Sequence, residues 1–110
     1  MRASAGDLGR FSDAGLLVLA SLADGPKHGY AMIADIKRFS GTALEPGTLY
    51  GALARLENAG WIAPEPAADR RRPYRLTELG QVALTRQLAT MREVVATGMN
   101  RLGLPGQVPA

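Results

Sequence analysis

The chain has 110 residues, the length of one domain, and its 46% hydrophobic and 21% charged residues exclude a disordered chain. It contains no cysteine, which excludes disulfides, thiolate catalysis and cysteine-bound zinc. The formal net charge of +3 is only weak evidence for a polyanionic partner. No apolar run reaches the ~20 residues of a membrane helix, so we expect a cytoplasmic protein without a membrane contact.

The first part of the chain predicts an arm and a helix. Residues 1–11 are mostly small or polar, and we expect them to form a flexible arm. Ser12 or Asp13 can cap a first helix, whose apolar residues over 16–23 point nearly all round it. This helix therefore needs cover on more than one side, and the segment 24–26, Asp-Gly-Pro, ends it.

Two further helices follow at short intervals. Apolar residues recur at helical spacing over residues 28–39 and predict a second helix there. A third helix begins at Pro46, because proline in a first turn loses no helical hydrogen bond. Its buried stripe consists of Leu49, Leu53 and Leu56, and residues 58–60 stop it.

The spacing of apolar residues changes after the third helix. Residues 61–66 and 73–77 are predicted to be extended, and their prolines restrict them to a short hairpin of edge type. An arginine-rich tip lies between them. Thr77 can cap a long last helix, and residues 103–110 are expected to form a disordered tail.

Three short helices, a hairpin and one long helix predict a mainly α, winged helix-turn-helix fold. We expect a DNA-binding domain at residues 12–78 and a dimerisation helix at residues 79–102. The last helix has no later element to cover its apolar stripe, and dimerisation is the simplest cover. The stripe comprises Leu84, Leu88, Met91, Val95, Met99 and Leu102.

Three segments carry a resemblance to a known family. They are PGTLYGALARLE at residues 46–57, GPKHGY at 25–30 and YRLTELG at 74–80. In this order they resemble the signature of the PadR family of bacterial transcription regulators, and in particular its short branch with one C-terminal helix. The resemblance implies operator DNA binding as a homodimer, usually repression, and often release by a small effector. It also implies that the last helix packs on the partner protomer near its first helix, which contains Leu16.

The third helix has the properties of a DNA-reading helix on the side opposite its leucines. A helix enters the major groove with small or polar groups, and this side carries Thr48, Gly51, Ala54, Arg55 and Asn58. Gly51 costs about 1 kcal/mol relative to alanine. Tolerated drift, close helix packing or close approach to DNA can explain it, and its small neighbours favour DNA. The free backbone N–H groups of Gly47 and Thr48 can bind a phosphate.

Two tyrosines and three arginines complete the predicted DNA surface. Two interpretations stay open for Tyr50, a contact to phosphate or base edges and a half-buried packing role. Tyr30 can likewise contact the DNA backbone or join the core. Arg70, Arg71 and Arg72 lie at the expected wing tip, where they can follow phosphates or enter the minor groove.

Other polar residues have simpler interpretations. His28 is expected to be a cap or turn residue, because no second ligand accompanies it, and we expect no metal or cofactor. Trp61 should anchor the wing in the core, and Arg75 can pair with Glu57 or Glu65. Three basic residues are weaker candidates for contacts to the DNA backbone: Lys27, Lys37 and Arg38.

We do not expect an enzyme. The chain has a single histidine, its carboxylates are scattered, and it has no glycine-rich loop followed by Lys-Ser or Lys-Thr for nucleotide phosphates. The alternative to a regulator is a winged-helix protein-interaction module that has lost DNA binding. The arginine-rich tip and the small residues of the third helix oppose that alternative.

Overall fold

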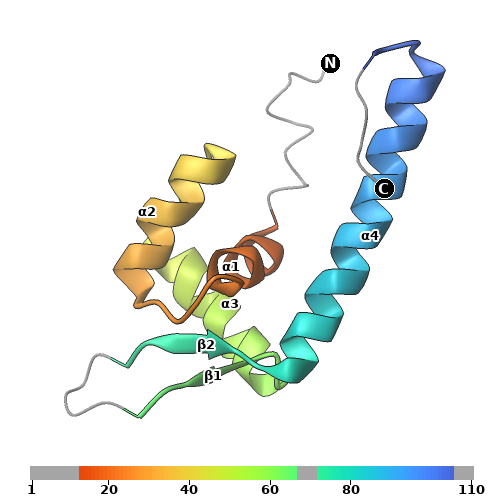
Figure 1. The fold of residues 1–110 in the computed structure, drawn as a ribbon. Coiled ribbons are helices and arrows are strands. Elements are labelled where there is room, and N and C mark those ends of the chain that lie inside the picture. Colours follow the sequence, from red (N-terminus) through yellow and green to blue (C-terminus); the bar gives the residue numbers. More distant parts are fainter. Residues whose placement is uncertain (1–12, 67–71, 106–110) are drawn as a thin grey trace.

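The computed structural model describes residues 13–66 and 72–105. Within these ranges, four helices and a two-stranded antiparallel sheet follow one another in the order that the sequence predicts (Figure 1). They are α1 (Ala14–Leu22), α2 (Gly29–Ser40), α3 (Pro46–Asn58), β1 (Ile62–Pro64), β2 (Tyr74–Leu76) and α4 (Glu78–Arg101). The mainly α, winged helix-turn-helix fold is confirmed, with the hairpin as the wing.

Three predicted features lie wholly or partly outside the described residues. They are the arm at 1–11, the wing tip with Arg70 and Arg71, and residues 106–110 of the tail. Arg72, the last residue of the predicted tip, is described and exposed.

Local signals in the sequence define the ends of the helices. The Asp13 side chain caps α1 by accepting a hydrogen bond from the Leu16 N–H, with an O···N distance of 3.1 Å. The Thr77 side chain caps α4 in the same way through the Gly80 N–H, at 3.0 Å. Gly41 ends α2 in the left-handed conformation, at φ 76°, which glycine adopts without strain. The predicted helix ends are therefore correct to within one or two residues.

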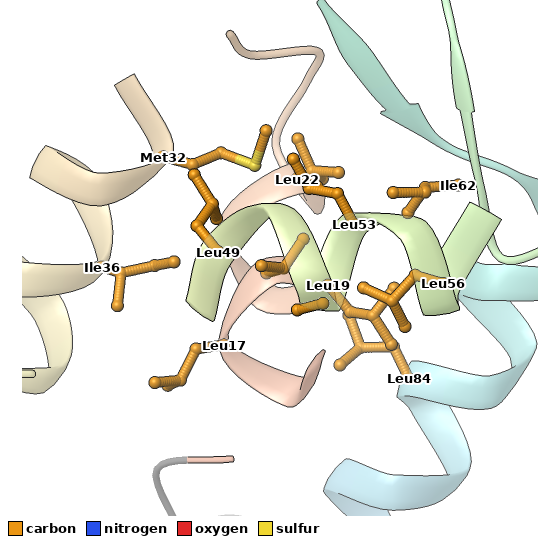
Figure 2. Close-up of a cluster of buried hydrophobic side chains, with 12 residues drawn as sticks. Leu17, Leu19, Leu22, Met32, Ile36, Leu49, Leu53, Leu56, Ile62 and Leu84 are labelled. Carbon is orange, nitrogen blue, oxygen red and sulfur yellow. The ribbon is translucent and has the colours of Figure 1, made fainter. Parts of the chain in front are cut away.

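The core surrounds α1, which contacts α2, α3, α4 and β2. The expectation that this helix is covered on more than one side is confirmed. Figure 2 shows leucines of α1 and α3 facing Met32 and Ile36 of α2 at one end, and Ile62 and Leu84 at the other. The least exposed large apolar side chains are Val18, Leu22, Met32, Ile36, Leu49, Leu53 and Ile62. Each of them stabilises the fold by roughly 1.5–3 kcal/mol through burial.

The buried side of α2 excludes one of the two interpretations that the sequence left open for Tyr30. Met32 and Ile36 are buried, whereas Tyr30 is 80% exposed and Phe39 about half exposed. Tyr30 precedes Met32 by two residues, a rotation of about 200° that places it on the opposite side of the helix. Phe39 lies in the last turn, which extends past α1 (Figure 1). The interpretation of Tyr30 as a core residue is therefore wrong.

The wing is tied to the loop between α1 and α2. In the hairpin, Ile62 is opposite Leu76 and Pro64 is opposite Tyr74. The Lys27 N–H donates to the Tyr74 carbonyl at 3.1 Å, and the Tyr74 N–H donates to the Lys27 carbonyl at 2.9 Å. These two bonds hold the base of the wing beside the start of α2.

Only the first turns of α4 join the core, and the rest of the helix extends away from the other elements (Figure 1). Leu84 is 5% exposed and packs with Leu19 and Leu56 (Figure 2). Farther along, Leu88 and Val95 are about half exposed. In the described part of the chain, no helix is long and apolar enough to cross a membrane.

Candidate nucleic-acid interface

The two sides of α3 differ sharply in burial. Its apolar side, with Leu49, Ala52, Leu53 and Leu56, is buried in the core. The opposite side, which we call the reading face, is open to solvent in the protomer. Its exposed residues are Gly47, Thr48, Ala54, Arg55 and Asn58, and Gly51 is partly exposed. The sequence therefore places the small and polar residues of α3 on the surface that a duplex could reach.

The first turn of α3 is suited to an anion. Pro46 occupies the first turn, as predicted, and Glu45 is the N-cap residue, although its side chain makes no capping hydrogen bond in the described structure. The first N–H groups of a helix have no acceptor within the helix, so those of Gly47 and Thr48 are available to a phosphate. A methyl group at Gly47 would have no described atom within 4 Å, so the approach to this turn is open.

Packing within the protomer does not explain the glycine at residue 51. Among the described residues, an added methyl group there would meet only the Arg55 guanidinium, at an ordinary contact distance of 3.6 Å. Close helix packing would instead bring backbone or core atoms to this position. Close helix packing within the protomer therefore does not explain Gly51, whereas tolerated drift and close approach to DNA stay open.

The two tyrosines of the predicted surface lie near the start of α2. Tyr50 is 53% exposed, and its hydroxyl lies over Gly29, the first residue of α2. Tyr30 follows Gly29 directly and is exposed. Tyr50 is therefore partly packed and partly accessible, which combines the two interpretations left open for it.

Two of the three basic residues that are weaker candidates for DNA contact form ion pairs within the protomer. Among the described residues the structure holds two ion pairs, Lys27 with Asp24 and Arg38 with Asp35. The Lys27 ammonium also donates to the Ser21 carbonyl, and its hydrogen bond to Asp24 lowers the pKa of that carboxyl group. The Lys27 side chain is largely buried, so it serves the fold, whereas Arg38 and Lys37 stay exposed.

Arg75 does not form the ion pair that the sequence suggested. It lies opposite Ala63 in the hairpin and is exposed, and within the described ranges neither Glu57 nor Glu65 pairs with it. Tyr74 and Leu76, its neighbours in β2, pack against the core instead. Because successive side chains of a strand point to opposite faces, Arg75 points away from that core.

A backbone contact at residue 80 fixes α4 to the end of α3. The Thr77 hydroxyl donates to the Gly60 carbonyl at 2.6 Å, and the Thr77 N–H donates to the Trp61 carbonyl at 3.1 Å. A methyl group at Gly80 would lie 2.0 Å from the Trp61 carbonyl oxygen, which is far too close. The Trp61 side chain packs partly buried against the core, so its predicted anchoring role agrees with its position. Sequence analysis missed Gly80, although a glycine in the first turn of a helix was the available signal.

A polar contact between α1 and α2 was also missed. The Ser21 hydroxyl, which is fully buried, donates to the Asp35 carboxylate at 2.7 Å. Asp35 pairs in turn with Arg38. A serine within an otherwise apolar helix was the signal, because a buried hydroxyl needs a partner. This contact helps to fix the position of α2, which carries Tyr30.

The residues predicted for dimerisation separate into three groups. Leu84 lies in the protomer's own core and has almost no surface left for an interface. Leu16 and Met91 line a groove of about 560 Å³ between α1, the end of α3 and α4. The others lie farther along α4 or directly after it, where Leu88, Val95 and Leu102 are exposed and Met99 is partly buried.

The structure offers little for a metal ion. His28 is the N-cap residue of α2, as predicted, and its side chain makes no capping hydrogen bond to the described residues. In the ranges that the structure describes, no group of three or more His, Asp or Glu side chains could hold a metal ion.

Comparison with families of known proteins gives one match over most of the chain. The model of the "Transcriptional regulator PadR-like family" matches residues 18–86. This range runs from α1 into the third turn of α4 and includes the reading face and the wing. The exposed half of α4 lies beyond it.

Two curated proteins are similar to this chain over 82 residues each. An uncharacterized 37.1 kDa protein in transposon TN4556 of Streptomyces fradiae is 50% identical over 74% of this chain, which spans only 24% of that relative's length. The transcriptional regulator Rv3488 of Mycobacterium tuberculosis is 35% identical, over 72% of this chain and 76% of that protein.

Solved structures of transcription regulators have the same fold. A PadR family transcriptional regulator from Eggerthella lenta is 30% identical, with a TM-score of 0.66 over 88% of this chain and 87% of that one. A transcriptional regulator from Clostridium thermocellum is 24% identical, with a TM-score of 0.71 over 91% of this chain and 97% of that one.

Proposed function

This chain belongs to the PadR-like family of transcriptional regulators, and from that premise we propose that it binds operator DNA as a homodimer and represses transcription. PadR-family regulators bind DNA and are not enzymes. The observation that carries the proposal is the reading face of α3, which presents small and polar residues to solvent while the other side of the helix is buried.

The reading face suits the major groove for steric and chemical reasons. Residues 47, 51 and 54 are glycine or alanine, so the backbone of α3 can approach the base edges closely. Thr48 and Asn58 carry the hydrogen-bonding groups that distinguish bases. Arg55 can bind a guanine edge or a phosphate, because its guanidinium presents paired donors.

The wing adds a contact that does not depend on sequence. Arg72 is exposed and lies two residues before the start of β2. Arg70 and Arg71 precede it in the chain and lie outside the described residues. Arginines at this place can neutralise phosphates or enter the minor groove. We therefore assign base recognition to α3 and most of the charge-dependent affinity to the wing.

The proposed dimer forms through the exposed half of α4. Two recognition helices would then lie in successive major grooves, with half-sites roughly 10 bp apart or at a related spacing set by the dimer.

We also propose that a small apolar effector binds the groove between α1, the end of α3 and α4, which Trp61 also lines. The volume of this groove lies in the usual range for such ligands. Trp61 is the only tryptophan, so its fluorescence reports whether a compound that releases DNA also enters this groove.

A titration with duplex DNA tests the proposed function. The DNA is an inverted repeat upstream of the protein's own gene, located by footprinting, and a scrambled duplex is the reference. Affinity for both should fall at least about 100-fold between 50 and 200 mM salt, because binding releases counterions from neutralised phosphates. No footprint, or no salt dependence, would support the protein-interaction module and overturn the proposal.

Variants separate the two kinds of contact. Arg71→Ala or Arg72→Ala should weaken operator and scrambled DNA equally and reduce the salt slope by about two, one for each protomer of the proposed dimer. Thr48→Ala or Asn58→Ala should instead reduce the preference for the operator, by roughly five- to 150-fold for a well-made base contact. Arg86→Ala, an exposed arginine on α4, is the matched control and should change neither quantity. The docking model fails if all these variants bind as the wild type does.

A further inference from the structure

Gly29 begins α2, yet its backbone does not require glycine. Positive φ angles occur at four described glycines, Gly25, Gly41, Gly60 and Gly103, and Gly29 is not among them. Backbone conformation therefore does not account for glycine at this position.

The side chain of Tyr50 occupies the space that a methyl group at Gly29 would need. An added Cβ would lie 2.8 Å from the Tyr50 hydroxyl, 3.3 Å from Tyr50 Cζ and 3.4 Å from Leu49 Cδ2. The nearest atom is the far end of a side chain that is 53% exposed, so the ring can move away. Alanine at residue 29 would therefore displace Tyr50 more readily than it would disrupt the fold.

Tyr50 lies at the edge of the reading face. Its neighbours in the chain are Leu49, in the core, and Gly51, on the reading face. Each residue of a helix is rotated by about 100° from the next, so Tyr50 projects between the core and the reading face. Its ring reaches across to Gly29, two residues after Lys27, whose backbone is bonded to Tyr74 in the wing. The hydroxyl thus lies between the DNA-reading helix and the base of the wing, where the strand of a bound duplex would pass.

We propose that Gly29 is a positioning residue, which seats Tyr50 so that its hydroxyl donates a hydrogen bond to a DNA phosphate beside the reading face. This inference rests on the proposed function. Because Tyr50 lies beside the face that reads bases and not on it, the contact contributes affinity without sequence preference. In this proposal residue 29 is glycine because a side chain there would displace the Tyr50 hydroxyl, and not because glycine stabilises α2.

A double-mutant cycle tests the inference with four proteins: wild type, Gly29→Ala, Tyr50→Phe and the double variant. Tyr50→Phe removes the hydroxyl and should weaken binding to operator and scrambled DNA alike, by roughly three- to tenfold for each protomer of the dimer, the contribution of one hydrogen bond. Gly29→Ala should weaken binding by a similar factor. The double variant should be no worse than either single variant, because both changes remove the same contact.

Two further measurements separate positioning from a structural role. Proton NMR should detect a nuclear Overhauser effect between the Tyr50 ring and the Gly29 Hα protons in the wild type. In Gly29→Ala the new methyl group should show no strong effect to the Tyr50 ring, because the ring has moved away. Thermal unfolding of Gly29→Ala should begin at the same temperature as in the wild type or a higher one, since alanine favours helix. A lowered unfolding temperature, or a strong Overhauser effect between the methyl group of residue 29 and the Tyr50 ring, would overturn the inference.

The binding data also distinguish this inference from the proposed function. If the wild type binds DNA and Tyr50→Phe binds equally well, or if the two single effects add in the double variant, the positioning role of Gly29 is wrong while the regulator remains. If the wild type itself does not bind DNA, the proposed function fails, and this inference fails with it.

Discussion

A single backbone contact leaves less room for a side chain at Gly80 than at any other described glycine. A Cβ at this position would lie 2.0 Å from the Trp61 carbonyl oxygen, and a backbone atom cannot move away as a side chain can. We expect Gly80→Ala to reduce the free energy of unfolding by about 3 kcal/mol or more, since overpacking forces the backbone to shift. Urea denaturation followed by circular dichroism measures the change.

Gly98→Ala is the control for that experiment. Gly98 lies within α4, and an added methyl group would have no described atom within 4 Å. The same substitution should leave the free energy of unfolding unchanged or raise it by up to about 1 kcal/mol, because alanine favours helix. Equal stability of the two variants would show that the first turn of α4 can shift to accept a side chain.

The wing carries a titrating group whose protonation is linked to folding. Burial raises the pKa of Tyr74 above its ordinary value of 10.0, and the charge of Glu57 adds to the shift. The folded chain thus holds this proton more tightly than the unfolded chain. The resulting stabilisation is complete below pH 10 and is lost as the pH rises above 10 through the folded pKa.

We therefore expect the wild type to lose more stability than Tyr74→Phe between pH 9 and pH 11. The difference in slope should be at most about 1.4 kcal/mol per pH unit, the limit for one proton. Urea denaturation at several pH values measures it. Parallel curves for the two proteins would mean that Tyr74 titrates alike in the folded and unfolded chains.

At the scale of helices and strands, local chemistry makes the sequence informative. The capping hydrogen bonds of Asp13 and Thr77 involve only N–H groups three residues farther along the chain. The starts of α1 and α4 could therefore be predicted from a few neighbouring residues. The buried side of α2 could not. Tyr30 is large and apolar enough for a core, and only the position of α1 and α3 decides that Met32 is buried instead.

The far half of α4 presents an apolar side that a second copy can cover. Val95 and Val82 allow a matched test, because they are 47% and 48% exposed but lie roughly 140° apart around the helix. Val95→Glu should dissociate the proposed dimer, raising its dissociation constant at least about 100-fold, because a buried unpaired carboxylate is costly. Val82→Glu should leave it intact.

Sedimentation equilibrium at micromolar concentration measures both variants. DNA binding by Val95→Glu should weaken as well, since a monomer reaches one half-site only. Dimers that persist in Val95→Glu and dissociate in Val82→Glu would place the interface on the other side of α4.

For the whole molecule, the order of elements and the reading face could be predicted, whereas the contacts that join the elements could not. Apolar spacing shows that Leu49 and Leu53 are buried and so leaves Thr48 outside. The contacts of Gly29 with Tyr50 and of Gly80 with Trp61 join residues 19 or more positions apart. Nothing in the local sequence indicates that these segments meet. For the same reason the sequence could not show that Arg75 forms no ion pair with Glu57 or Glu65 in the described structure.

The division of α3 into a buried side and an open side has a consequence for how such a protein can change over time. Exchanges at Thr48, Ala54 or Asn58 disturb no core atom, so they cost little folding free energy. With the docking that we propose for α3, one scaffold can therefore be redirected to a new promoter by a few mutations in a single helix, with its architecture kept whole.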